Sequence, residues 1–230
     1  MRALSLAPRA PFPLLRARSA FRSRGWPNSG ALSSFSTSFL ATENPISEGG
    51  RWVNGLATGL LWKNMQTGSG NAFATATNPS AFDDNCAHLI GFSADHYIEG
   101  VVHRAVGYSP VDAHEIEWLL RADITPNFTR AYEVLADSGG GFQIVLWNGD
   151  RGDFTVLSPT GPGTGTIAHG DVIRAQIVGT TITVFKNDVQ VATVDNSVLT
   201  SGNPGIGSFM RGNGNVLASF GWQSIEASDI

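Results

Sequence analysis

Two glutamates two positions apart, Glu115 and Glu117, are the residues whose types and spacing are most suited to chemistry. Side chains two positions apart in a β-strand lie on the same face, so both carboxyl groups are predicted to face one side of a sheet. A pair of nearby carboxyl groups can cleave a glycosidic bond, because one attacks carbon while the other protonates the leaving oxygen. The same face is predicted to continue through Arg121 and Asp123. The opposite, core-facing stripe is predicted to contain Ile116, Trp118, Leu120, Ala122 and Ile124.

A tryptophan offers a second kind of chemistry. Trp147 shares a predicted strand face with Gln143 and Val145, and Asp150 follows shortly after the strand. Exposed aromatic rings can stack on sugar rings while carboxylates and amides bind the hydroxyl groups. Trp147 is therefore the best candidate for an exposed glycan contact, although core packing is favoured over glycan stacking for any single tryptophan of this chain. Trp52 and Trp62 are predicted to fill the core.

The elements that must position these residues are predicted to be strands. The chain of 230 residues contains only 15% charged residues and many Gly, Ser, Thr and Asn residues, which argues against long solvated helices and coiled coils. From residue 35 onward, short alternating runs are separated by turn-forming clusters, the pattern of an antiparallel sandwich or barrel. Strands are predicted at 35–41, 59–65, 72–77, 86–93, 97–106, 115–124, 130–136, 142–147, 153–157, 172–178, 181–186, 189–194, 205–209 and 216–225.

The clearest local structure is a series of three antiparallel strands near the C-terminus. The turns between them are predicted at Gly179-Thr180 and Asn187-Asp188, and Asn-Asp tolerates the positive φ angles of a two-residue hairpin loop. The segment 200–207 is predicted to be a loop that leads into a further strand.

These C-terminal residues carry a family resemblance. The succession "GDVIRAQIVGTTITVFKNDVQVATV…TSGNPGIGSF" resembles the C-terminal half of concanavalin A-like lectin/glucanase sandwiches of the laminin-G-like kind. Upstream, "FSTSFLATENPISEGGRWVNG" resembles the opening strand and turn of bacterial and phage members. The resemblance covers most of residues 35–225 and implies an all-β, two-sheet antiparallel jelly-roll sandwich. It says little about function, because this fold hosts lectins, hydrolases, lyases, adhesins and virion proteins.

The resemblance also tests for enzymatic activity. Laminarinase-like hydrolases carry E-x-D-x-x-E or E-x-D-x-E on one strand, and here Leu119 or Leu120 stands at the acid/base position. Leucine cannot act as a general acid, so a non-enzymatic protein is predicted. The motifs of alginate-lyase-type relatives are missing, although Tyr132 could act as their tyrosine. The candidate ligand-binding residues are Glu115, Glu117, Arg121, Tyr132, Trp147 and Asp150.

No metal or other cofactor is predicted. Members of the family often have an acidic residue in the opening strand that joins a calcium site, but Ser36 and Ser38 stand there in this chain. The acidic segments 83–85 and 148–153 could bind Ca²⁺, but ordinary turns explain them better. The single cysteine, Cys86, cannot form an internal disulfide and is predicted to be a small buried residue.

Charge divides the chain into an arm, residues 1–34, and a body, residues 35–230. Residues 1–42 carry a net charge of +6, and residues 43–230 carry −10. An acidic body repels phosphate backbones, so it is not expected to bind nucleic acid. No stretch of about 18 apolar residues predicts a membrane span. The arm fits a flexible tail, a mistaken start, a mitochondrial transit peptide or a segment that docks on a neighbouring subunit.

Three functions remain open at this point. The first is a non-enzymatic module that recognises glycans or attaches to a surface. The second is a structural protein that decorates a phage capsid or tail, with residues 1–34 contacting an assembly partner. The third is a polysaccharide-cleaving enzyme that uses Glu115 and Glu117. The first two favour an oligomer or larger assembly at an extracellular surface or in a virion over a mitochondrial location.

Overall fold

Two antiparallel sheets form most of the structure. The computed structural model describes residues 32–76, 84–109, 114–158, 167–211 and 214–230. One sheet has eight strands in the order β13-β12-β11-β6-β15-β4-β3, with β1 also paired to β15. Its strands are β1 (Ser34–Thr37), β3 (Met65–Gly68), β4 (Asn71–Ala74), β6 (His96–Arg104), β11 (Val172–Val178), β12 (Thr181–Lys186), β13 (Val189–Asp195) and β15 (Phe220–Asp229).

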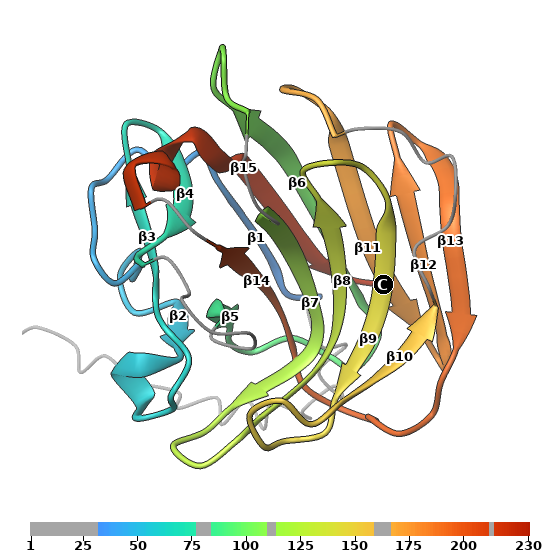
Figure 1. Cartoon of the computed structure of the whole chain (residues 1–230). Helices are drawn as coiled ribbons and strands as arrows, with labels where there is room; N and C mark the ends of the chain where they lie inside the picture. The colour runs from blue at the N-terminus through green and yellow to red at the C-terminus, as the bar shows by residue number, and fades with distance from the viewer. Residues whose placement is uncertain (1–31, 77–83, 110–113, 159–166, 212–213) are drawn as a thin grey trace, which may run out of the picture. The chain divides into compact units, whose positions relative to one another are not determined.

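The second sheet has seven strands in the order β10-β9-β8-β7-β14-β5-β2. Figure 1 shows β7, β8, β9 and β10 side by side in this layer, with the eight-stranded sheet behind it. Its strands are β2 (Trp52–Asn54), β5 (Asn85–Leu89), β7 (His114–Ile124), β8 (Thr129–Asp137), β9 (Phe142–Trp147), β10 (Phe154–Ser158) and β14 (Asn203–Met210). Short 3-10 helices occur at η1 (Leu56–Thr58) and η2 (Gly214–Ser219). The predicted all-β sandwich is confirmed.

The main core lies between the two sheets and contains alternate residues of β7. Ile116, Trp118 and Leu120 are completely buried, as predicted. The indole ring of Trp118 meets that of Trp222 edge to face, with ring centroids 6.1 Å apart. Gly100 makes room for this pair, because a Cβ there would lie 2.6 Å from Cδ1 of Trp222.

The second half of β7 differs from the prediction. Its register against β8 shifts between Leu120 and Asp123, and Arg121 has a φ of 48°. Such a bulge inserts an extra residue and changes which face the following side chains occupy. Ala122 and Ile124 consequently join Leu119 in an apolar cluster on the outer face, so their predicted core-facing positions are wrong.

The predicted strand at 59–65 is also wrong. This segment follows η1, and Gly59 ends that turn in a left-handed conformation with φ 93°. Leu60 and Trp62 of the segment pack against the outer face of the seven-stranded sheet, where the same apolar cluster holds Cys86. The predictions that Trp52, Trp62 and Cys86 are buried are confirmed.

The predicted C-terminal hairpins are confirmed. β11 pairs with β12, and β12 pairs with β13. Gly179 lies in the first turn with φ 59°, and Asn187 and Asp188 lie in the second with φ 49° and 64°. β14 begins at Asn203, so the segment 200–207 predicted to be a loop is already strand from Asn203 onward. Among the described residues, no helix is both long and apolar enough for a membrane crossing.

Candidate ligand-binding site

A cavity of about 290 Å³ lies on the outer face of the seven-stranded sheet. We call it the β7–β10 cavity. Its position follows from the strand register, because Glu115 pairs with Phe209 of β14, and Glu133 of β8 pairs with Val145 of β9. Neighbouring positions in paired strands share a face. The cavity is lined by Asp84, Glu115, Glu133, Leu135, Gln143, Val145, Trp147, Phe154, Phe209 and Arg211.

Aromatic rings form one wall of the β7–β10 cavity. Trp147 contacts Phe154 of β10, with ring centroids 5.3 Å apart, and Trp62 edge to face at 4.6 Å. The indole nitrogen of Trp147 donates a hydrogen bond of 2.5 Å to Glu133. Trp147 is only 4% exposed and packs against Trp62, so it is buried, as favoured for each tryptophan, and does not offer the exposed ring considered for glycan contact. Phe154 is 36% exposed and is the more accessible aromatic surface.

Four carboxyl groups lie in or beside the cavity. Burial raises the pKa of Glu115 to about 7, and the nearby Asp137 adds to the shift. Burial also raises the pKa values of Glu117 and Glu133 well above the ordinary value. The charge of Glu133 adds to the shift of Glu117, and the charge of Asp84 adds to both shifts. Removing carboxylates from water disfavours their charged form. The cavity therefore holds several acids that ionise less readily than exposed ones.

Glu117 lies beside this set without lining the cavity. It is fully buried, and within the described part of the chain neither of its carboxyl oxygens has a hydrogen-bond partner. Its register partner on β14 is Gly207, where a Cβ would lie only 2.1 Å from Oε2 of Glu117. Gly207, the second glycine of the sequence "PGIG", thus leaves the space that the buried carboxyl group of Glu117 occupies.

We expect Gly207→Ala to lower the free energy of unfolding by about 1 to 3 kcal/mol, because an added methyl group in a filled space forces neighbouring atoms to shift. Chemical denaturation would measure the change. The control is Gly68→Ala, where the nearest atoms would lie at 3.7 Å. Adding Glu117→Ala to Gly207→Ala should recover part of the loss. Additive effects of the two substitutions would contradict the proposed steric conflict.

We expect Glu115→Gln to change the pH dependence of stability. The pKa of about 7 in the folded protein lies above the ordinary value of 4.5, so the stability that this group contributes is fully present below pH 4.5 and is lost as pH rises through 7. Glutamine does not ionise, so the variant should gain about 3 kcal/mol relative to the wild type above pH 7. Denaturation at several pH values would measure this difference. The exposed turn variant Asp150→Asn is the control, and a pH-independent difference for Glu115→Gln would contradict the expectation.

The structure separates the residues predicted to form the site. Glu115 and Trp147 line the β7–β10 cavity, and Glu117 lies beside it. The predicted face shared with Gln143 and Val145 is confirmed for Trp147. Tyr132 instead lies in the core between the sheets, where its hydroxyl group donates to Oδ1 of Asn196 and accepts from the backbone of Leu199.

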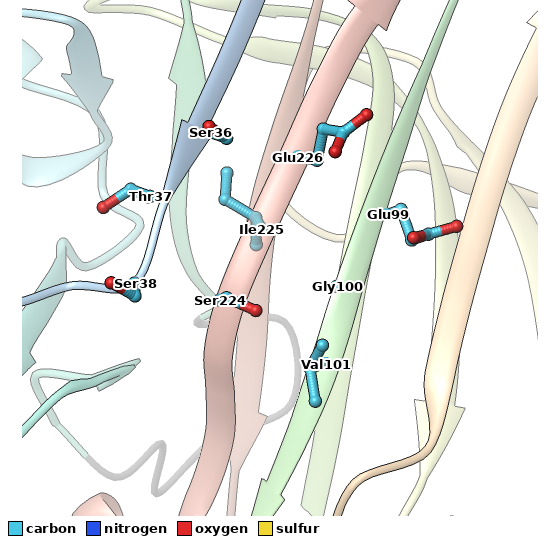
Figure 2. Close-up of a pocket in the computed structure, with 9 residues that line it drawn as sticks. All are labelled: Ser36, Thr37, Ser38, Glu99, Gly100, Val101, Ser224, Ile225 and Glu226. Atoms are coloured by element: carbon cyan, nitrogen blue, oxygen red, sulfur yellow. The ribbon is translucent and has the colours of Figure 1, made fainter.

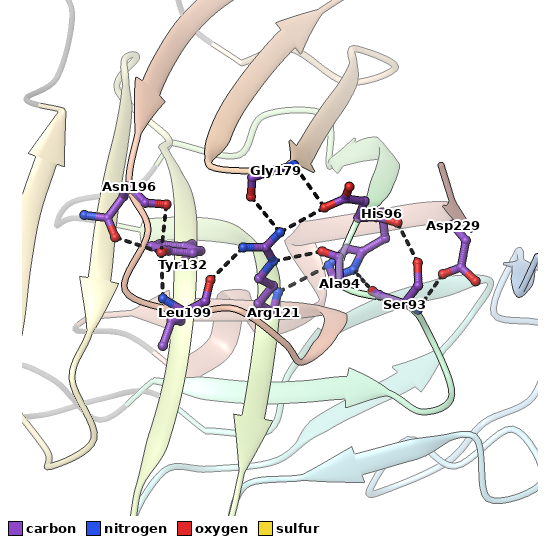
Figure 3. A network of polar contacts seen from close by, with 10 residues as sticks. Ser93, Ala94, His96, Arg121, Tyr132, Gly179, Asn196, Leu199 and Asp229 are labelled. Carbon is purple, nitrogen blue, oxygen red and sulfur yellow. Dashed lines mark hydrogen bonds and ion pairs between the residues drawn. The ribbon is translucent and has the colours of Figure 1, made fainter.

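Arg121 also lies away from the cavity, because the β7 bulge turns it into a buried network (Figure 3). Its guanidinium group donates to the carbonyl oxygens of Ala94, Leu199 and Gly179 and pairs with Asp95 at 3.0 Å. Its backbone nitrogen donates to His96. The predicted shared face with Glu115 and Glu117 is therefore wrong for Arg121, whose contacts fasten several loops together.

The two acidic segments considered for calcium lie in different surroundings. Asp150 is exposed in the turn between β9 and β10, where its carbonyl oxygen accepts from the backbone of Asp153. Asp84 lines the β7–β10 cavity, whereas Asp83 lies outside the described residues. Across the described ranges, no group of three or more His, Cys, Asp or Glu side chains is arranged to hold a metal ion.

Sequence reasoning missed several cavity residues, and Glu133 is the most important. It lies opposite Leu119 in the β7–β8 pair, so its side chain shares the face of Glu115 and Glu117. The sequence did contain a signal for Glu133, because alternation along the predicted strand 130–136 places the Glu133 side chain on the face of the sheet opposite to that of Tyr132. The remaining missed lining residues are Asp84, Leu135, Phe154, Phe209 and Arg211.

A second cavity of about 410 Å³ lies on the eight-stranded sheet. Figure 2 shows its lining on the neighbouring strands β1, β15 and β6. The surface contains short serines such as Ser36 and Ser224 together with Glu99 and Glu226, and no aromatic ring lines it. Glu226 also accepts a hydrogen bond from Tyr97, which raises the pKa of that tyrosine to about 12. The β7–β10 cavity is the better candidate because it combines aromatic walls with buried polar groups.

Comparisons with known proteins identify the architecture. No protein-family model and no curated protein sequence matches the chain. The carbohydrate-binding module CBM66 from Bacillus subtilis has a TM-score of 0.53 at 10% identity, over 80% of this chain and 95% of that one. The carbohydrate recognition domain of Emp47p has a TM-score of 0.53 at 17% identity, over 88% and 98% of the two chains.

An enzyme also shares the arrangement. The GlcNAcα1-4Gal-releasing endo-β-galactosidase from Clostridium perfringens has a TM-score of 0.53 at 9% identity, over 86% of this chain. The match spans 62% of the galactosidase chain. Likeness at such low identity concerns the fold, which can host different functions. The chain has the concanavalin A-like jelly-roll fold that its sequence resemblance predicted.

Proposed function

We propose that this protein is a non-enzymatic glycan-binding module whose ligand occupies the β7–β10 cavity. The observation that carries the proposal is the combination of Gln143 and Glu115 with Phe154 and Phe209 in one cavity. Amide and carboxyl groups can bind sugar hydroxyl groups, while aromatic rings cover the apolar faces of the sugar. The names of two structurally similar proteins, a carbohydrate-binding module and a carbohydrate recognition domain, add support.

A glycan array followed by calorimetry, with and without added Ca²⁺, tests this function. The wild-type protein should bind at least one oligosaccharide, and Gln143→Ala should weaken binding by about tenfold through loss of a polar contact. The matched control is Ser36→Ala, which removes a polar group from the cavity on the other sheet. Failure to bind any polysaccharide would refute the proposal, and equal losses in both variants would argue against the assigned cavity.

A polysaccharide-cleaving enzyme is the second candidate function. The sequence predicts that such an enzyme would use Glu115 and Glu117, but Glu117 is fully buried and does not line the cavity. The structure favours a different pair, Glu115 and Glu133, because both line the cavity and burial raises both pKa values. A carboxyl group that remains protonated can act as a general acid.

Reducing-sugar release separates this enzyme from a binding module. The wild type, Glu115→Gln and Glu133→Gln should all give background release if the protein only binds glycans. If the wild type releases reducing sugar and both variants release less, the protein hydrolyses glycans and the non-enzymatic proposal is contradicted.

Attachment to a surface or a phage particle remains a finer proposal, based on the basic arm of residues 1–34. Residues 1–31 lie outside the described part of the chain. The backbone nitrogen of Ser33 donates to Asp229 at 2.8 Å, and β1 pairs with β15, so a truncated chain beginning at Leu32 should keep these contacts. Light scattering would compare it with the full chain. Equal assembly of both would refute a docking role for the arm.

A further inference from the structure

The β7–β10 cavity is more acidic than recognition of a neutral sugar requires. Its lining contains Asp84 before β5, Glu115 on β7 and Glu133 on β8, whereas Arg211 is the one basic residue among the described residues that line it. Glu117 adds a fourth carboxyl group beside them, with both oxygens buried and without a hydrogen-bond partner in the described structure. The three lining carboxyl groups repel one another when they ionise, so a ligand that brings a positive charge into the cavity would be favoured.

Aromatic surfaces accompany these acids. Phe154 and Phe209 line the cavity, and Trp147 holds Glu133 through its indole nitrogen. The face of an aromatic ring attracts organic cations, and a carboxylate strengthens that attraction. Among the residues described, no group of three or more acidic, His or Cys side chains is arranged to hold a metal ion, whereas acids beside aromatic rings suit an organic cation.

We infer that the glycan bound in the β7–β10 cavity is cationic, with an amino sugar whose ammonium group contacts the carboxyl groups of Glu115 and Glu133. This inference rests on the proposed glycan-binding function and specifies its ligand class. An ammonium group supplies a positive charge and three hydrogen-bond donors, which can add to the bond that Glu133 already accepts from Trp147. The sugar ring then lies against Phe154 and Phe209.

Proton balance makes binding depend on pH. If the sugar amine arrives neutral and the Glu115 carboxyl group is protonated, the proton moves from the carboxyl oxygen to the amine nitrogen, and the ion pair forms without net gain or loss. Affinity should therefore be highest near neutral pH and should fall when both partners are protonated or both are deprotonated. The titratable and charged groups around this pair are Asp84, Cys86, Glu115, Glu117, Glu133, Asp137 and Arg211.

Three β-1,4-linked tetrasaccharides provide a matched test, because they differ at C2 of each ring. Calorimetry at about pH 7 would compare the tetramers of glucosamine, N-acetylglucosamine and glucose. The glucosamine tetramer should bind at least about tenfold more tightly than the other two, as expected for a charge-assisted contact. Equal or tighter binding of a neutral tetramer would refute the cationic ligand while leaving the glycan-binding function intact. Binding of none of the three would overturn this inference, whereas the glycan array tests the broader function.

Matched variants test whether the preference for the glucosamine tetramer arises in the β7–β10 cavity. Glu115→Gln and Glu133→Gln should each lower affinity for the glucosamine tetramer by about tenfold and should change binding of a neutral tetramer much less. Glu226→Gln removes one negative charge from the other cavity and should leave the preference unchanged. Thermal unfolding of each variant would verify folding. An unchanged preference in both folded cavity variants, or an equal loss in Glu226→Gln, would overturn the assignment.

Discussion

Arg121→Met is expected to lower the free energy of unfolding by about 3 to 5 kcal/mol, because several carbonyl oxygens lose a charged donor at once and each unsatisfied buried group costs about 1 to 3 kcal/mol. The guanidinium group donates to three backbone carbonyl oxygens as well as to Asp95. Methionine fills similar space but donates no hydrogen bond, so the carbonyl oxygens lose their shared partner. Chemical denaturation at neutral pH would measure the loss.

The same network explains why the effect should be large. Burial lowers the pKa of His96 to about 4, so the ring stays neutral and its Nε2 atom accepts the backbone hydrogen of Arg121. The ring contacts the carbonyl oxygen of Ser93, whose backbone nitrogen donates to Asp229 (Figure 3). Arg121 therefore connects β7 with β15 and with the loop between β11 and β12.

Arg130→Met is the matched control for this prediction. Arg130 is exposed, donates to the carbonyl oxygen of Asn148 and lies over the Phe128 ring. Exposed contacts of this kind contribute about 0 to 1 kcal/mol. A loss below about 1 kcal/mol for Arg121→Met, or equal losses in the two variants, would show that the buried network does not fasten the fold.

Phe154→Ala is expected to weaken glycan binding by about tenfold or more. Phe154 is the more exposed ring of the Trp147–Phe154 pair, so its loss removes contact area from the proposed ligand position. Aromatic side chains at the centre of a binding surface commonly contribute more than 1 kcal/mol. Calorimetry with the best oligosaccharide from the array would measure the change.

Stability should change much less than affinity in this variant. Phe154 lies on β10, an edge strand that pairs only with β9 within the described sheet. Val189→Ala, at an exposed apolar residue on the edge strand β13, is the control and should bind like the wild type. Wild-type affinity in folded Phe154→Ala would contradict a ligand position against this ring.

Much of the fold could be predicted from the sequence, because the alternation of apolar residues and the turn-forming residues match the observed strands and hairpins. Alternation identified β9, β11 and β12 with their observed bounds, and the positive φ angles of Asn187 and Asp188 confirm the predicted hairpin turn. The three-residue strand β2 was missed because it is too short for alternation to appear. The segment 59–65 has the composition of a strand, but before Met65 it pairs only through an isolated bridge between Lys63 and Asn85. Leu60 and Trp62 instead pack onto the outer face of a sheet.

The candidate site was predicted only in part. Strand alternation correctly placed Glu115 and Glu117 on one face, yet their burial depends on neighbours far away in sequence, including Gly207. The bulge at Arg121 could not be predicted, because a non-glycine residue with positive φ is stabilised there by distant contacts. Glu133 joined the site through strand pairing, which a search for acids along one strand overlooks.

The most direct test of the central claim is an NMR titration of isotopically labelled protein with an oligosaccharide that it binds. Backbone amide shifts should concentrate at the residues lining the β7–β10 cavity, including Glu133, Gln143 and Phe154. Shifts concentrated instead on β1, β15 and β6, around Ser36 and Ser224, would place the ligand in the cavity of the other sheet and contradict the account.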